Sequence, residues 1–115
     1  MKKTSVPKIM TISTEQQRRA VSSPQRMELL GLFVEREALS VAQMAERMGR
    51  PATALHYHVG VLEKAGILMR AGKQRAGKRS EVLYHPAAEM FRMEQERDDA
   101  AATEQALKTM ATAFR

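Results

Sequence analysis

The segment over residues 40–66 restricts the fold more than any other part of this 115-residue chain. It opens with SVAQ (40–43), a capping box in which the serine hydroxyl and the glutamine side chain satisfy free amides at a helix start. Apolar residues recur at helical spacing over 41–48, and Gly49 can adopt the left-handed conformation that ends a helix. A second helical pattern covers 51–65. The segment therefore predicts two short helices joined by a glycine turn.

A longer helix is predicted before this pair. Ser23 followed by Pro24 combines a hydroxyl cap with a residue whose missing N–H costs nothing at the first helical position. We expect this helix to end near Arg36. Its expected buried stripe consists of Met27, Leu30, Phe33 and Val34.

The first 21 residues are predicted to form a basic arm followed by a short helix. Three lysines lie in the arm over 1–12, which we expect to be flexible. STEQ (13–16) resembles another capping box and predicts a helix that runs to about Val21.

The excess positive charge is concentrated after the second helix of the pair. The chain has a formal net charge of +6, and RAGKQRAGKR (70–79) holds five cations and no acid, so removing those five leaves +1. Residues 67–69 and 81–84 have strand composition, which predicts a hairpin with a tip of about eight residues, closed by Pro86. The five cations, which favour a polyanionic partner, are Arg70, Lys73, Arg75, Lys78 and Arg79.

Residues 87–115 differ from the rest and are predicted to form an amphipathic C-terminal helix. Met93, Ala100, Leu107 and Phe114 are spaced seven apart, and Met110 occupies an interleaved position, although Glu96 interrupts the seam. Such a seam favours dimerisation with a second copy of the chain. The alternative is that this helix folds back over the preceding domain.

The outward face of the 51–65 helix is unusual. At about 100° per residue, Leu55, Val59 and Leu62 share one side, and small or polar residues occupy the other. An exposed glycine inside a helix costs roughly 1 kcal/mol relative to alanine. The face is therefore either an ordinary solvated one or one that lies close against another surface. Its candidate contact residues are Ala52, Thr53, His56, Tyr57, Gly60 and Lys64.

The two histidines of this helix do not suggest a metal site. His56 and His58 diverge around the helix, and His85 is distant in sequence, so no metal ligands are predicted. Pro51 leaves the helix start without a side-chain cap, so its free amides can accept a phosphate group.

Several function classes lack support. The chain has no cysteine, which excludes disulfides and thiolate chemistry and is compatible with a cytoplasmic location. No stretch approaches the roughly 20 apolar residues of a membrane span, so no membrane partner is expected. GKQRAGKRS (72–80) superficially resembles a phosphate-binding loop but has the wrong spacing. We predict no enzyme activity, no catalytic residues and no cofactor.

Taken in order, these elements resemble the winged helix-turn-helix regulators of the ArsR-like group. The resemblance spans 22–86, and residues 45–66 carry its most specific spacing without a gap. Its carriers are SPQRMELL (23–30), SVAQMAERMG (40–49), TALHYHVGVLEKAGIL (53–68) and EVLYHP (81–86). The expected fold is thus mainly α with a small β-hairpin, an α+β class.

The resemblance implies a dimeric transcription regulator, often a repressor, that binds an inverted-repeat operator in double-stranded DNA. The 51–65 helix would read the major groove, and the 69–82 hairpin, the wing, would straddle backbone phosphates or the adjacent minor groove. The resemblance favours His58 as a hydrogen-bonded packing residue turned toward the core, with direct DNA contact as the alternative. Arg26 would either hold a carboxylate or approach DNA. The effector, if any, is not marked. The alternative function is a winged-helix module that binds protein, with 87–115 as its docking surface and no DNA binding.

Overall fold

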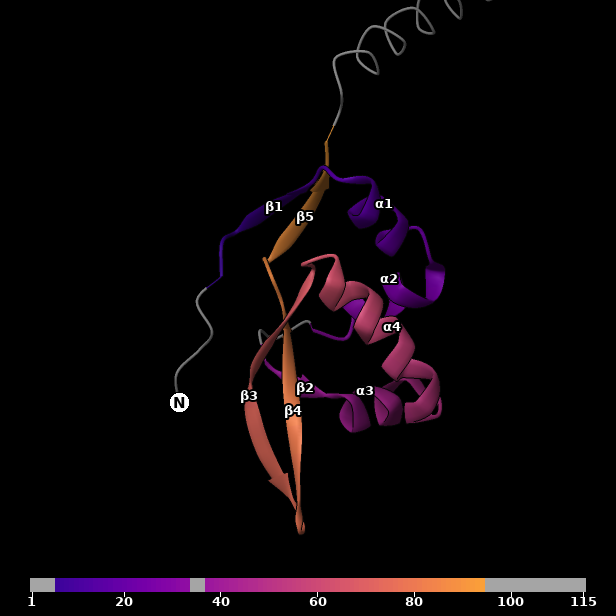
Figure 1. The fold of residues 1–115 in the computed structure, drawn as a ribbon, viewed down its shortest axis with the longest axis vertical. Helices are drawn as coiled ribbons and strands as arrows, with labels where there is room; N and C mark the ends of the chain where they lie inside the picture. Colours follow the sequence, from indigo (N-terminus) through magenta and orange to yellow (C-terminus); the bar gives the residue numbers. More distant parts are fainter. Residues whose placement is uncertain (1–5, 34–36, 95–115) are drawn as a thin grey trace, which may run out of the picture.

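The computed structural model describes residues 6–33 and 37–94, which form four helices and five strands (Figure 1). In chain order these are β1 (Ile9–Ile12), α1 (Glu15–Val21), α2 (Pro24–Leu30), β2 (Leu39–Ser40), α3 (Val41–Met48), α4 (Ala52–Lys64), β3 (Leu68–Ala76), β4 (Arg79–Pro86) and β5 (Met90–Met93). The expected α+β class is confirmed. Within these ranges, none of the helices combines the length and the apolar character that a membrane span requires.

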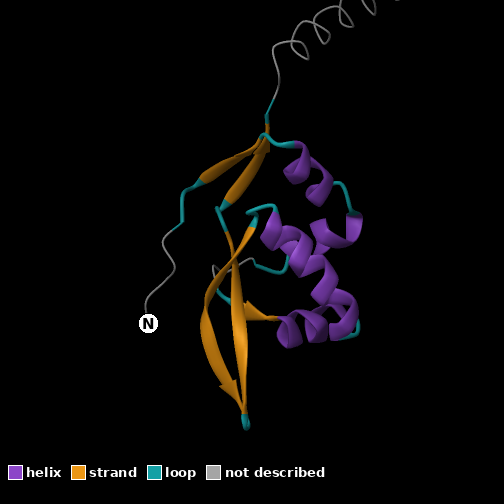
Figure 2. Ribbon diagram, in the orientation of Figure 1, coloured by secondary structure: helices purple, strands orange, loops and turns teal. Residues whose placement is uncertain are grey.

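A three-stranded antiparallel sheet forms one layer, and the helices lie on one side of it (Figure 2). Its central strand, β4, pairs with β2 through Leu39–Tyr84 and Ser40–Leu83 and with β3 over most of its length. The far ends of β3 and β4 extend past the helices as the wing (Figure 1).

The hydrophobic core lies between this sheet and the helices. Its fully buried members include Leu29, Leu39, Met44, Leu55, Leu62 and Ile67. The prediction that Leu55, Val59 and Leu62 form the buried side of α4 is confirmed.

The prediction for α2 is wrong in its length and in part of its buried stripe. The helix ends at Leu30 because the Gly31 N–H turns back to carbonyls of the last turn and tighter turns follow it. Met27 is 53% exposed and Leu29 is fully buried, whereas Leu30 and Phe33 pack partly buried against the core and Val34 lies outside the described residues. Over so short a helix, tertiary packing and not the apolar period decides which side faces inward.

Two of the three predicted side-chain caps are confirmed, and the third is displaced by one residue. Ser23 caps α2 with Pro24 at its first position, and Ser40 caps α3 in a complete capping box. In α1 the cap is Thr14 and its partner is Gln17, whose side-chain oxygen accepts hydrogen bonds from the Ser13 and Thr14 amides. Ser13 with Gln16 and Thr14 with Gln17 both fit the capping-box pattern, so the sequence alone does not choose between the two registers.

The hairpin is longer and its turn tighter than predicted. Ala76 pairs with Arg79, which leaves a two-residue turn of Gly77 and Lys78, and Gly77 supplies the positive φ that such turns need. A bulge between Arg70 and Lys73 places one extra residue on β3 and shifts the register by one residue, and the pairing with β4 continues beyond it. The basic residues assigned to a loop therefore lie mostly on paired strands.

The segments outside the winged unit also differ from the predictions. Residues 9–12, expected to be a flexible arm, form β1 and pair in parallel with β5. Met93, placed in the C-terminal helical seam, is instead the last residue of β5 and half exposed. The other seam residues, Ala100, Leu107, Met110 and Phe114, lie outside the described residues.

Candidate nucleic-acid interface

The turn between α3 and α4 fixes the angle at which α4 leaves the domain. Gly49 ends α3 with φ of +65°, as predicted, and the Arg50 N–H reaches back to the Ala45 carbonyl at 3.1 Å. A left-handed residue at this point is characteristic of a helix stop. Arg50 then pairs with Glu28 of α2 at 3.5 Å, which ties the turn to the helix behind it.

The side of α4 that faces away from the core is open to solvent. Thr53, His56, Tyr57 and Lys64 are exposed, whereas Ala52 and Gly60 are partly covered. Tyr57 is 68% exposed, an unusual exposure for an aromatic side chain. A Cβ built on Gly60 would meet nothing within 4 Å, so internal packing does not demand glycine there. The described structure therefore leaves this face free to approach an external surface.

The start of α4 has no side-chain cap. Pro51 occupies the cap position, as the sequence indicates, and makes no side-chain hydrogen bond to the first turn. The first turn also lacks acidic residues, so no carboxylate competes for its amides. Such a helix start carries a partial positive charge and suits an anion.

His58 points away from this face and toward Arg26. Its Nδ1 lies 3.1 Å from the Arg26 guanidinium, which donates because an arginine nitrogen has no acceptor capacity. Burial, together with the charges of Arg26 and Arg50, lowers the pKa of His58 below its ordinary value of 6.5. His58 thus makes the internal hydrogen bond expected of it.

Arg26 has a structural role that neither sequence alternative named. Its Nε donates to the Ala20 carbonyl at 2.6 Å, and a terminal nitrogen donates to the Arg19 carbonyl at 3.3 Å. These carbonyls lie at the end of α1, where helix carbonyls lack internal partners. Arg26 therefore joins the end of α1 to His58 of α4.

The wing presents four cations that have no acidic partner. Lys73, Arg75, Lys78 and Arg79 are exposed, and within residues 6–33 and 37–94 none of them makes an ion pair. Gln74 alternates with Lys73 and Arg75 and contacts Gln43 of α3, so these two cations lie on the opposite face of β3.

Arg70 differs from the other cations predicted for the wing. Its Nε donates to the Glu63 carboxylate of α4 at 2.8 Å, and this pairing raises the pKa of the guanidinium. Arg70 thus connects the base of the wing to the end of α4, and its charge is partly neutralised. The role of Glu63 is not predictable from the sequence, because a charged residue near the end of a helix does not indicate which partner it pairs with.

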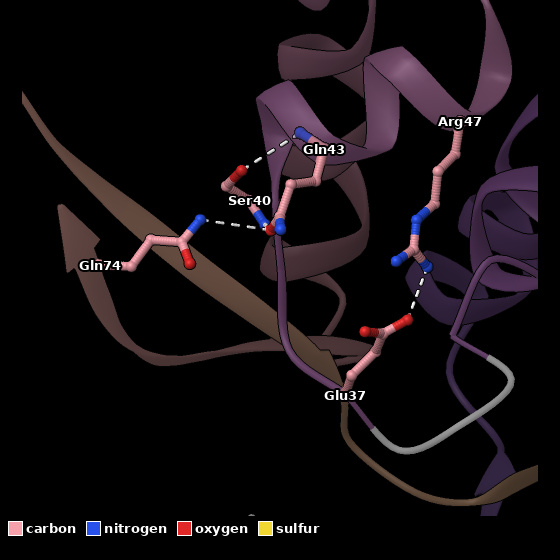
Figure 3. Close-up of polar contacts among 5 residues, drawn as sticks. All are labelled: Glu37, Ser40, Gln43, Arg47 and Gln74. Carbon is pink, nitrogen blue, oxygen red and sulfur yellow. Dashed lines mark hydrogen bonds and ion pairs between the residues drawn. The ribbon is translucent and has the colours of Figure 1, made fainter. Parts of the chain in front are cut away.

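A second connection joins the wing to α3 (Figure 3). The Gln43 side-chain oxygen accepts from the Ser40 amide at 2.9 Å, as in a capping box, and lies 3.4 Å from the Gln74 side-chain nitrogen. Figure 3 also shows Arg47 of α3 paired with Glu37 at 2.6 Å, just before β2. The residues that start α3 therefore also help to position the wing.

The helix face and the wing meet at a hollow of about 380 Å³. Ala52 and His56 of α4 line it from one side, and Arg79 and Ser80 of β4 line it from the other. Candidate residues from two separate sequence segments thus border one concave surface. Tyr57 and Lys64 lie on the other flank of α4, beside α1.

Comparison with known proteins identifies the fold. Residues 21–71 match the family model of a helix-turn-helix domain. A similar solved structure is the solution structure of Mb0332 from Mycobacterium bovis, a homodimeric winged helix-turn-helix DNA-binding domain of a possible ArsR-family regulator. The two sequences are 18% identical, and the structures align with a TM-score of 0.51 over 84% of this chain and 76% of that one. This chain has a winged helix-turn-helix fold.

Other solved structures are also similar to this winged helix-turn-helix. Reduced HlyU from Vibrio cholerae has 17% identity and a TM-score of 0.50, over 82% of this chain and 84% of that one. Rv0081 from Mycobacterium tuberculosis has 26% identity and a TM-score of 0.48, over 84% of each chain. None of the curated protein sequences matches this chain. The family model and the solved structures agree with the helix-turn-helix fold that the sequence resemblance implies.

Proposed function

We propose that this winged helix-turn-helix chain is a transcription regulator that binds double-stranded DNA. The observation that carries the proposal is the shared border of α4 and the wing. There an open helix face adjoins a hairpin with four exposed cations that make no ion pair among the described residues. A helix is the element that fits the major groove, about 12 Å wide. A projecting cationic hairpin beside it suits the phosphates at the groove edge.

In this proposal α4 reads the bases. Thr53, His56 and Tyr57 offer hydroxyl and imidazole groups that can donate to or accept from base edges. Gly60 permits close approach because no side chain stands between the helix and the groove. The uncapped start at Pro51 and the Lys64 ammonium would meet phosphates on either side.

The wing provides affinity that does not depend on sequence. We assume that each protomer contacts roughly three to five phosphates. The contacts can come from Lys73, Arg75, Lys78 and Arg79 and from the start of α4. For a dimer on B-DNA, log K should then fall with log salt at a slope between about −5 and −9. Arg70 contributes less because Glu63 already holds it.

We further propose that the chain binds as a homodimer on an inverted repeat and represses transcription. Ile9 and Met90 are directly paired in the β1–β5 sheet, and both are about half exposed or more. Adjacent large apolar side chains at the surface are typical of a contact region. The Mb0332 structure, which is homodimeric, supports the same assembly. Two-fold symmetry then sets half-sites about 10–10.5 bp apart, or a multiple of this.

Selection from a pool of random DNA duplexes with the purified full chain tests the proposal. We expect an enriched inverted repeat, and we expect sedimentation to give the mass of a dimer bound to it. A footprint that stays blank at low ionic strength on every selected pool would refute DNA binding and favour the protein-interaction alternative.

A further inference from the structure

Tyr57 projects from the open face of α4, yet its ring rests against the next residue of the same helix. The side chain is 68% exposed. Its ring contacts the His58 ring in a T-shaped arrangement, with centroids 5.4 Å apart and planes at 67°. Successive residues of a helix point about 100° apart, so the Tyr57 ring must lean toward His58 to make this contact. The contact favours one orientation of a side chain that could otherwise rotate in solvent.

The His58 ring is itself held by a directional bond. Its Nδ1 lies 3.1 Å from a terminal nitrogen of Arg26. A guanidinium only donates, so Nδ1 must be the acceptor, and the hydrogen of the neutral ring lies on Nε2. Turning the ring over would move Nδ1 away from its donor. The bond to Arg26 therefore selects one orientation of the ring against which Tyr57 rests.

Arg26 is anchored at two further points. Its Nε donates to the Ala20 carbonyl at 2.6 Å, and its other terminal nitrogen donates to the Arg19 carbonyl at 3.3 Å. All three nitrogens of the planar guanidinium are thus engaged, which leaves the side chain little freedom. A continuous series of contacts runs from the end of α1 through Arg26 and His58 to an exposed ring on α4.

We infer that Arg26 is a positioning residue for base reading, which acts through His58 to hold the Tyr57 ring ready for the groove. The inference rests on the proposed function, in which Tyr57 contacts bases. It gives Arg26 no contact with DNA. A side chain that is ordered before binding loses less conformational freedom when it binds, so the preorganised ring strengthens binding to the preferred sequence. Binding through phosphates gains nothing from it.

The ratio of two affinities of the full chain tests this role: that for the selected duplex and that for a scrambled duplex of equal length, at one salt concentration. Arg26→Met removes the guanidinium, and Arg26→Lys keeps the charge but replaces the planar fork by a single nitrogen. We expect the ratio to fall at least about fivefold in both variants, since one well-placed base contact contributes at least that much discrimination. The salt slope on the scrambled duplex should change by less than about 1, because no phosphate contact is lost.

Arg19→Met is the matched control. Arg19 and Arg26 both line the hollow between α1 and α4 where Tyr57 lies, so this variant removes the same charge from the same place. It leaves the Arg19 carbonyl and the bonds of Arg26 intact. The affinity ratio should therefore stay unchanged. Urea unfolding confirms that each variant is folded, and a partly unfolded protein lowers both affinities alike without changing their ratio.

A measurement without DNA separates this inference from the proposed function. We expect nuclear Overhauser contacts between the Tyr57 and His58 rings in the unchanged chain and their loss in Arg26→Lys. If neither Arg26 variant folds, His58→Gln replaces them: its oxygen can still accept from Arg26 but it offers no ring to Tyr57, so the affinity ratio should again fall.

Three results would overturn the positioning role. These are the absence of ring contacts in the unchanged chain, an unchanged affinity ratio in the folded Arg26 variants or in the His58→Gln that replaces them, and an equal loss of the ratio in Arg19→Met. The failure of any duplex to be selected would instead refute the proposed function, whatever the ring contacts show.

Discussion

Neutralising two cations of the wing tests quantitatively how much the wing contributes to DNA affinity. Lys73 and Arg75 are exposed, make no ion pair with any residue that the structure describes, and lie on the face of β3 opposite Gln74, which contacts α3. Replacing both by glutamine therefore removes charge and leaves the core and the wing contacts intact. The stability of the domain should change by less than about 0.5 kcal/mol.

The expected magnitude follows from the number of phosphates lost. If each cation meets one phosphate, a dimer loses four contacts, and each contact contributes about 0.9 to the slope of log K against log salt. The slope should therefore become less steep by about 3.6. The loss should be similar for every DNA sequence, because phosphate contacts carry no base information.

Fluorescence anisotropy of a labelled duplex at several salt concentrations measures this slope. The matched control is Lys8→Gln with Arg92→Gln, which removes the same charge from exposed positions on the β1–β5 side, away from the wing (Figure 1). The control should change the slope by less than about 1. Equal changes for the two double variants would show that net charge, and not the wing, governs binding.

The remaining predictions concern reading and stability. His56→Ala and Tyr57→Ala should change which sequence is enriched in a duplex selection; an unchanged consensus would remove these residues from base reading. Ser40→Ala breaks the capping box of α3 and should cost about 1 kcal/mol of unfolding free energy in urea, and an unaltered midpoint would contradict this. Gly49→Ala forces a side chain into φ of +65° and should cost roughly 1–2 kcal/mol by the same measurement, although the space around it is open. Because the pKa of His58 is lowered, the folded state binds its proton more weakly than the unfolded chain. The neutral His58 therefore stabilises the folded state fully above pH 6.5, and this contribution is lost as the pH falls below that value. His58→Gln should make the loss of stability between pH 7 and 5 smaller. An identical loss in both proteins would exclude this role.

Local signals in the sequence were sufficient for the helices around the turn. Ser40 with Gln43, Gly49 and Pro51 act within one or two turns of backbone, and the structure places each in the predicted role. The candidate face of α4 was also predictable, because helical geometry alone separates Tyr57 from Leu55.

Pairings between distant segments were not predictable in the same way. Nothing local to residues 9–12 indicates that β5 will pair with them, and the short β5 has a composition that also suits a helix start. The wing is long because of the Gly77 turn and the bulge after Arg70. These two features allow β3 and β4 to stay paired through polar residues whose strand propensity is low.

The sequence proposes the candidate site as a set of residues, and it does not reveal the contacts those residues make. Arg70 was grouped with the other wing cations, and only the structure shows that Glu63 holds it. Arg26 bonds to backbone carbonyls, which have no signature in a sequence. The buried His85 Nε2, which has no hydrogen-bond partner among the described residues, also has no signature in the sequence.

Amide hydrogen exchange of the full chain, with and without a selected duplex, tests most directly whether α4 and the wing together form the DNA-binding surface. We expect DNA to slow exchange at residues 52–57 and 73–79 and to leave 90–93 unchanged at protein concentrations where the chain is already a dimer. Protection confined to 90–93, or none at 52–57, would contradict the account.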